Sequence, residues 1–146
     1  MFLFDVNVLI AMADPQHSHH AAVHRWLSQQ GGGDWATCPL TENGFVRVVS
    51  QPNYRGGTRS PCEAIQLLRR MKHVPNWRHS FWADDCSLTD PSLFHEIRVA
   101  GPRQITDLYL TALALCHQAR LVTFDGSVPW HAVVGATGQT VLVLSS

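Results

Sequence analysis

Acidic side chains at four separated points of the sequence have the chemistry of a cation site. Asp5 and Asp125 each follow a short apolar run, and Glu42 and Asp107 each lie near the start of a helix-like stretch. Carboxylates held within a few ångströms repel one another, and some protonate unless a cation lies among them. Oxygen ligands favour Mg²⁺ or Mn²⁺ over zinc, so these four residues predict a hard divalent ion.

The expected elements would bring these acids together. In a parallel α/β sheet, the carboxyl end of each strand and the amino end of the next helix share one edge. A helix of about 11 residues spans ~16 Å, and a strand of four or five residues spans ~15 Å in return. A helix from Asp107 and a following strand that ends at Asp125 would therefore begin and end at the same level, the edge that Asp5 and Glu42 also occupy.

Such a site can carry out phosphodiester hydrolysis. One or two divalent ions can activate water and stabilise the leaving oxygen, which is metal-dependent nuclease chemistry. Each acid also has an ordinary structural alternative. Asp5 can cap a helix, Glu42 and Asp107 suit helix amino ends, and Asp125-Gly126 suits a turn. These alternatives do not explain why all four acids face one edge.

Hydrophobic patterning predicts strands that alternate with helices. The strands are expected at 2–4, 35–38, 78–82, 121–124 and 141–144. The helices are expected at 8–13, from a cap at Ser18 to Gly31, from Thr41 to Gln51, at 61–71, briefly from Asp90, and from a cap at Thr106 to about residue 117. This alternation predicts a three-layer α/β/α fold around a mostly parallel sheet of four to five strands. A length of 146 residues suits a single domain, 1–146.

Composition indicates the cellular location of the protein and the way in which it could bind nucleic acid. The net charge is zero, so nucleic-acid binding would have to be local. The four cysteines, at 38, 62, 86 and 116, form no Cys-x-x-Cys motif, which predicts reduced and mostly buried thiols in a cytoplasmic protein. The N-terminal run lacks the basic start of a signal peptide, and no apolar run reaches the ~18 residues of a membrane span.

One segment is strongly basic although the whole chain is neutral. Residues 47–78 carry seven basic side chains, and Glu63 is their only acid. We expect Arg55, Arg59, Arg69 and Arg70 to contact RNA phosphates, with a solvated surface as the alternative. Four histidines, at 17, 19, 20 and 24, lack a Cys or acid at zinc-ligand spacing, so a solvent-facing helix start is favoured over a metal site.

The segments around the four acids resemble one protein family. They are Phe4-Asp5-Val6-Asn7-Val8-Leu9, Thr41-Glu42-Asn43-Gly44-Phe45, Thr106-Asp107-Leu108-Tyr109-Leu110 and Leu121-Val122-Thr123-Phe124-Asp125. In order and spacing they resemble the PIN-domain family, in particular the VapC-type toxins of bacterial toxin–antitoxin pairs. The resemblance covers nearly the whole chain, and the stretch from Arg47 to Gly57 resembles one subset of these toxins.

The resemblance implies a Mg²⁺- or Mn²⁺-dependent endoribonuclease that forms a homodimer and is neutralised by a small antitoxin. The acidic site would consist of Asp5, Glu42, Asp107 and Asp125, supported by the polar side chains of Asn7 and Thr123. An acidic tail of the antitoxin could use the same basic surface as RNA. Many family members have another acid or an aromatic residue directly after the last Asp, where this chain has Gly126. The sequence therefore does not decide between one metal ion and two.

Two other functions compete with this interpretation. A haloacid-dehalogenase-like phosphatase also begins with a strand and an Asp, but it needs a second Asp where this chain has Asn7, and an essential lysine. The chain has a single lysine, Lys72. A catalytically silent PIN fold kept as a binding module is the non-enzymatic alternative, and the complete set of acids argues against it.

Overall fold

Five parallel strands form the centre of the molecule. The computed structural model describes residues 1–55, 60–95 and 101–145. The sheet order is β3-β2-β1-β4-β5, and every pairing is parallel. The strands are β1 (Phe2–Phe4), β2 (Gly33–Thr37), β3 (Trp77–Phe81), β4 (Arg120–Thr123) and β5 (Val141–Val143). The expected sheet is thus confirmed, with five strands in one direction.

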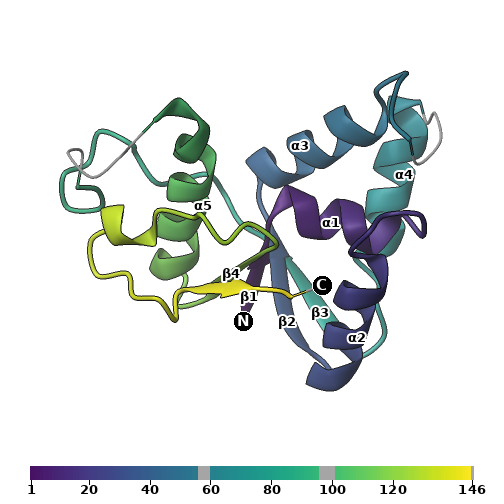
Figure 1. Cartoon of the computed structure of the whole chain (residues 1–146), viewed down its shortest axis with the longest axis horizontal. Helices are drawn as coiled ribbons and strands as arrows, with labels where there is room; N and C mark the ends of the chain where they lie inside the picture. The colour runs from purple at the N-terminus through teal and green to yellow at the C-terminus, as the bar shows by residue number, and fades with distance from the viewer. Residues whose placement is uncertain (56–59, 96–100, 146) are drawn as a thin grey trace.

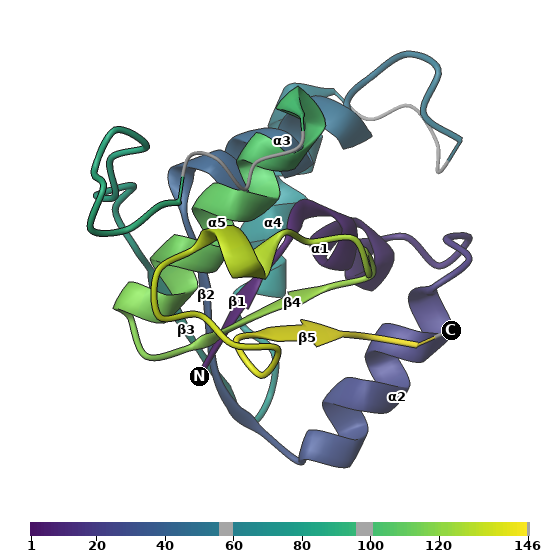
Figure 2. The same cartoon turned by 60° about the vertical axis from the view of Figure 1, so that its left-hand side comes forward.

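Helices cover both faces of this sheet. One side carries α1 (Val6–Ala13), α2 (His20–Gln30), α3 (Pro39–Val49) and α4 (Pro61–Met71), and the other carries α5 (Ile105–Cys116), as Figure 1 shows. The turned view in Figure 2 brings α5 forward over the sheet. Two short 3₁₀ turns, Pro102–Gln104 and Trp130–Ala132, flank α5 and the path to β5. The three-layer α/β/α fold is therefore confirmed.

Alternation along β1 produces a separate core on each face. Leu3 pairs with Ala36 and Leu121, and all three belong to the cluster under α5. Phe4 pairs with Val122, and both belong to the cluster under α1–α4. Successive side chains of a strand point to opposite faces, so a central strand buried on both sides is apolar at nearly every position. This explains the uninterrupted Phe2-Leu3-Phe4 run.

The strand order reverses direction between β1 and β4. From β1 the chain adds β2 and then β3 on one side, and β4 and β5 follow on the other side. Ligands of open α/β sheets bind beyond the carboxyl ends of the strands at such a reversal. The first residues past these ends are Asp5 after β1 and Phe124 and Asp125 after β4.

Most helices that differ from the sequence predictions differ in the residue at which they begin. Asp5 caps α1, so that helix begins at Val6. Pro39 opens α3, and Thr41 lies one turn inside, where its hydroxyl accepts a hydrogen bond from the backbone N–H of Cys38 (3.0 Å). A 3₁₀ turn leads into α5 at Ile105, so Thr106 is not its cap. The helix expected at 61–71 is confirmed, with Ser60 and Glu63 as a reciprocal cap.

Three local expectations were wrong. Ser18 does not cap α2, which begins at His20 without a side-chain cap. The helix expected from Asp90 is a turn, in which the Asp90 carboxylate accepts hydrogen bonds from the backbone N–H and hydroxyl of Ser92. The thiols are not mostly buried, because only Cys38 is fully enclosed. No helix among the described residues is long and apolar enough to span a membrane.

Two of the four histidines near the start of α2 contact the preceding helix, although His24 remains exposed and the other three histidines are half-buried. His20 Nδ1 lies 2.8 Å from the carbonyl oxygen of Ala11, and His24 Nε2 lies 3.1 Å from that of Met12. Both carbonyls belong to the last turn of α1, where backbone acceptors lack helical partners. His19 stacks on Phe124 with ring centroids 4.3 Å apart.

Candidate active site

Asp5 is the most enclosed of the predicted acids. Its side chain is 6% exposed, and its two oxygens accept hydrogen bonds from the Val6 backbone N–H (2.6 Å) and the Thr123 hydroxyl (2.7 Å). Burial raises the pKa of this carboxyl, although the Thr123 hydrogen bond acts in the opposite direction. A nearby cation would favour the ionised form against this cost of burial.

Asn7 and Thr123 form a hydrogen-bonded bridge between the first turn of α1 and the end of β4. The Asn7 amide donates to Thr123 Oγ1 (2.9 Å), and Asn7 Oδ1 accepts from the Phe124 backbone N–H (3.3 Å). Thr123 Oγ1 also accepts from the Asp125 backbone N–H (3.1 Å). The bridge therefore fixes the orientation of Asp5 and the start of the turn that carries Asp125.

Asp125 is held by a residue that the sequence interpretation did not assign. One carboxylate oxygen accepts hydrogen bonds from the Ser127 backbone N–H (2.7 Å) and hydroxyl (2.6 Å). These bonds lower the pKa of Asp125 and keep it ionised. The signal was the spacing Asp-x-Ser, because an Asp side chain commonly bonds the backbone two residues ahead.

Asp107 interacts electrostatically with Asp5 and Asp125. It lies in the first turn of α5 and is half-buried. Burial, followed by repulsion from Asp5 and from Asp125, raises the pKa of Asp107 to about 6. Asp5, Asp107 and Asp125 are thus within electrostatic reach of one another although they come from three different elements.

Glu42 lies in a different environment, because it forms a salt bridge with the side chain of Lys72. Lys72 Nζ is 2.5 Å from Glu42 Oε1, and the Thr37 hydroxyl donates to the same oxygen at 2.6 Å. Thr37 Oγ1 has one proton, which it gives to Glu42, so the 2.8 Å contact from His79 Nε2 requires that nitrogen to be the donor. Sequence reasoning missed this group, whose signal was the single lysine of the chain.

The four acids thus form a set of three and a separately paired fourth. Within the described residues, no three His, Cys, Asp or Glu side chains lie close enough to hold one ion between them. The donor set nevertheless suits a hard divalent cation in its chemistry, because all three side chains are carboxylates and a cation would relieve the repulsion that helps to raise the pKa of Asp107.

Basic and apolar side chains border Glu42. A groove between α3 and α4 has Val46, Ile65 and Leu68 among its walls, with Glu42, Lys72 and Arg69 also lining it. Arg55 and Arg70 are exposed. Arg78 pairs with Asp34 (2.7 Å) on the neighbouring strand, at the opposite end of β2 from Thr37. Arg59 lies outside the described residues.

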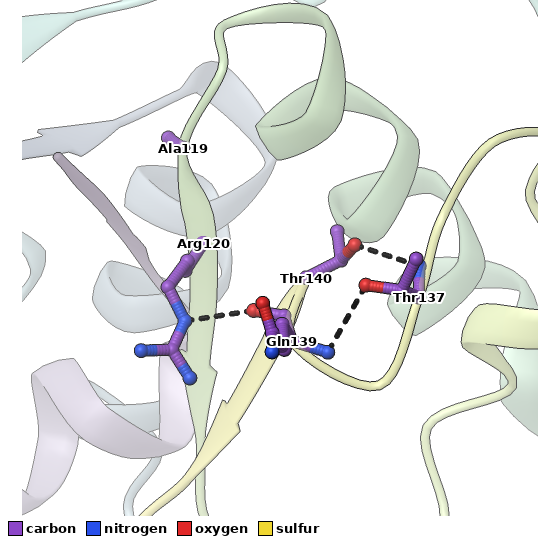
Figure 3. A pocket seen from close by; sticks show the side chains of 5 residues that line it. All are labelled: Ala119, Arg120, Thr137, Gln139 and Thr140. Atoms are coloured by element: carbon purple, nitrogen blue, oxygen red, sulfur yellow. Dashed lines mark hydrogen bonds between the residues drawn. The ribbon is translucent and has the colours of Figure 1, made fainter.

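A second hollow lies near the start of β4, at the opposite end of that strand from the acidic side chains. Ala119, Arg120, Thr137, Gln139 and Thr140 line it, as Figure 3 shows. Its hydrogen bonds are local, for example from Arg120 Nε to the Gln139 carbonyl oxygen (2.8 Å). Arg120 begins β4, whereas Thr123 ends it, so this hollow is separated from the carboxylates by the length of the strand.

Comparisons with known proteins agree with this geometry. The family model "PIN domain" matches residues 2–130. Ribonuclease VapC44 of Mycobacterium tuberculosis is 44% identical over 142 residues, which cover 97% of this chain and 98% of that protein. Ribonuclease VapC39 of the same organism is 41% identical over 133 residues, covering 91% of this chain and 94% of that protein.

A solved structure supports the same fold. The crystal structure of Mycobacterium tuberculosis VapC20, a sarcin-ricin loop cleaving toxin, superposes with a TM-score of 0.55 and covers 92% of this chain and 97% of that one. Its sequence identity is 12%, so this likeness concerns the fold alone. The family model and the extensive identity to the VapC proteins show that this chain belongs to the PIN-domain family, among the VapC-type ribonuclease toxins.

Proposed function

We propose that this protein is a Mg²⁺- or Mn²⁺-dependent endoribonuclease and the toxin of a toxin–antitoxin pair. The observation that carries the proposal is that the Thr123 hydroxyl holds both the Asp5 carboxylate and the backbone of Asp125 at the strand-order reversal, where Asp107 is within reach of their charges. Repelling carboxylates cost stability, and a site that binds a divalent cation gives a reason for keeping them. The identity to ribonucleases VapC44 and VapC39 supports RNA as the substrate.

Each part of the proposed site has a separate task. Asp5, Asp107 and Asp125 would hold the cation, and Glu42 would join them when it leaves Lys72. A bound divalent cation supplies an activated water and offsets charge on the leaving oxygen of the phosphodiester. Thr123 and Asn7 orient Asp5, and Ser127 orients Asp125. Lys72 and Arg69 offer positive charge for a phosphate beside Glu42.

The partners follow from the family. We propose a small cognate antitoxin, a homodimeric assembly and a cytoplasmic location, because the resemblance to VapC-type toxins implies all three. The exposed arginines at 55, 69 and 70 are the proposed phosphate contacts. Family membership excludes the phosphatase alternative, and the catalytically silent alternative is decided by the following experiment.

The test measures cation binding and RNA cleavage on the same preparation. Calorimetry on metal-free protein should show Mn²⁺ binding, and Mn²⁺ should raise the melting temperature because a ligand of the native state stabilises it. A structured RNA should be cut with Mn²⁺ or Mg²⁺ and left intact with EDTA. Cation binding without cleavage of any RNA in a total-RNA pool would indicate the silent binding module, and no binding at millimolar Mn²⁺ would contradict the metal site.

A further inference from the structure

Two thiols face each other on the side of the molecule opposite α1–α4. Cys86 lies in the segment that follows β3, and Cys116 is the last residue of α5. Their sulfur atoms are 3.8 Å apart. Cys86 is half-buried against the core beneath α5, and Cys116 is exposed. A disulfide bond measures about 2.05 Å, so the two sulfurs need to approach by less than ~2 Å.

The segment that carries Cys86 is anchored at its start by Trp82, which contacts both β2 and the residue after α5. We define residues 82–86 as the strap. At its start, the Trp82 backbone N–H donates to the Thr37 carbonyl oxygen (2.9 Å). The Trp82 ring stacks on His117, next to Cys116, with centroids 3.9 Å apart and planes within 6°. In Figure 1 the chain can be followed from β3 across to the α5 side.

The strap also reaches the helix that carries Glu42. Asp84 Oδ2 accepts a hydrogen bond from the Leu40 backbone N–H (3.1 Å) in the first turn of α3. The strap has no regular secondary structure, so it can shift by the small distance that a covalent bond requires without breaking a helix or strand. A covalent bond between the strap and α5 would therefore link α3, which carries Glu42, to α5, which carries Asp107.

We propose that Cys86 and Cys116 form a reversible disulfide, made by exchange with a low-molecular-weight disulfide. The Cys116 thiolate attacks one sulfur of that compound, its S–S bond breaks, and one small thiolate leaves. Cys86 then loses its proton to solvent and attacks the Cys116 sulfur, and the second small thiol leaves. Two protein thiols are oxidised and one small disulfide is reduced to two thiols.

The order of attack follows from exposure. Cys116 is open to a dissolved reagent, whereas burial and the hydrogen bond to Cys116 raise the pKa of Cys86 to about 12. Cys86 therefore reacts second, once a mixed disulfide has formed within its reach. Disulfides in cytoplasmic proteins are mostly transient and redox-sensing, which suits a pair of this kind. This proposal does not depend on the ribonuclease activity.

The experiment treats the folded, fully reduced protein with oxidised glutathione in native buffer. Free thiols should fall from four to two, and the mass should fall by two hydrogen atoms. Peptide mapping should find Cys86 joined to Cys116. The cross-link restricts the unfolded chain between these residues, so the melting temperature should rise by several degrees, up to about 10 °C. Dithiothreitol should reverse every change.

Variants separate this pair from general thiol reactivity. Cys62→Ser removes an exposed cysteine on α4 and should leave the cross-link unchanged. Cys86→Ser should instead trap a glutathione adduct on Cys116, because the second attack is impossible. The proposal is overturned if the wild-type protein keeps such an adduct without a Cys86–Cys116 bond. It is also overturned if Cys62 is cross-linked as readily as Cys86.

Discussion

The pKa of Asp107 reflects both the burial of this carboxyl and its repulsion by Asp5 and Asp125. Its pKa is raised to about 6, first by burial and then by Asp5 and Asp125. The folded protein therefore holds this proton more tightly than the unfolded chain, where the pKa is near 3.8. In the absence of metal, ionisation of Asp107 should cost stability, and the loss should develop as the pH rises from about 4 to about 6.

Asp107→Asn should remove that cost in metal-free protein. A shift of this size is worth at most ~3 kcal/mol, and solvent screening at a half-exposed site reduces it to about 1 kcal/mol. Urea unfolding in EDTA should show the variant more stable than the wild type at pH 8 and no different below pH 4. An Asp107→Asn protein that is less stable than the wild type at pH 8 would contradict the repulsion.

Thr123 is the second residue whose role can be measured directly. Thr123→Val keeps the shape of a side chain that is fully buried but leaves Asp5 and Asn7 without their shared partner. An unsatisfied buried polar group costs about 1–3 kcal/mol, and loss of a group that orients a metal ligand lowers activity or metal affinity about 10–100-fold.

The matched control for Thr123 is Thr111→Val in α5. Thr111 is equally buried, but its hydroxyl donates only to the backbone carbonyl oxygen of Asp107 (2.7 Å). Denaturant unfolding and Mn²⁺ calorimetry should show the control close to the wild type. Equal losses in the two variants would mean that the Thr123 hydroxyl has no special relation to Asp5.

Among the elements, α1 and α3 must approach closely to place Glu42 beside the strand ends. Gly44 makes this possible, because a Cβ atom at that position would lie 2.6 Å from Val6 Cγ2. Gly44 is buried in the middle of α3, where glycine is otherwise unfavourable. The close packing of α1 against α3 therefore explains why glycine stands at this helical position.

Gly44→Ala should destabilise the protein although alanine is the better helix former. Overpacking of a tight interface costs about 1–3 kcal/mol, which exceeds the gain in helix propensity of up to ~1 kcal/mol. The melting temperature should fall by several degrees in calorimetry. Gly126→Ala, which meets nothing within 4 Å, is the control and should change it little. A Gly44→Ala protein as stable as that control would show that α1 and α3 can move apart freely.

The elements also show what the sequence could and could not predict. Short apolar runs such as Phe2-Leu3-Phe4, alternating with helical patterns, predicted the parallel sheet, because strands buried on both faces are apolar at nearly every position. Helix starts were less predictable, because the expected cap at Thr106 is overridden by a 3₁₀ turn from Pro102. The acids could be assigned from their order in the chain, but their hydrogen-bond partners could not. Lys72 and Thr37 meet at Glu42 only through long-range packing of α4 and β2.

At the scale of the whole molecule, the neutral net charge conceals a local asymmetry. Asp5 and Asp125 lie where the strand order reverses, whereas Arg47 lies on α3, Arg69 and Arg70 lie on α4, and Arg55 lies in the segment between these two helices. Nucleic-acid binding that depends on few basic contacts should weaken with salt, with a slope of about 0.7 per phosphate contact for single strands. The basic surface therefore makes a testable contribution to RNA affinity.

Arg69→Glu combined with Arg70→Glu should weaken RNA binding and flatten its salt dependence. Binding would be measured by fluorescence anisotropy in an Asp5→Asn background, so that the RNA is not cut. The charge-matched control is Arg25→Glu with Arg120→Glu, which lie on α2 and at the start of β4, away from the acids. An unchanged slope in the Arg69/Arg70 variant would show that this surface is only solvated.

The most direct test of the account is RNA cleavage by Asp5→Asn. The substitution keeps the shape and removes a buried negative charge, so the fold should survive. If Asp5 holds the cation, a loss of ~3–4 kcal/mol of transition-state stabilisation lowers the rate about 10²–10³-fold. Asp34→Asn, at the far end of β2, should cleave at the wild-type rate. Asp5→Asn protein that is purified in parallel and still cuts RNA at the wild-type rate would contradict the assignment of Asp5 and the proposed site.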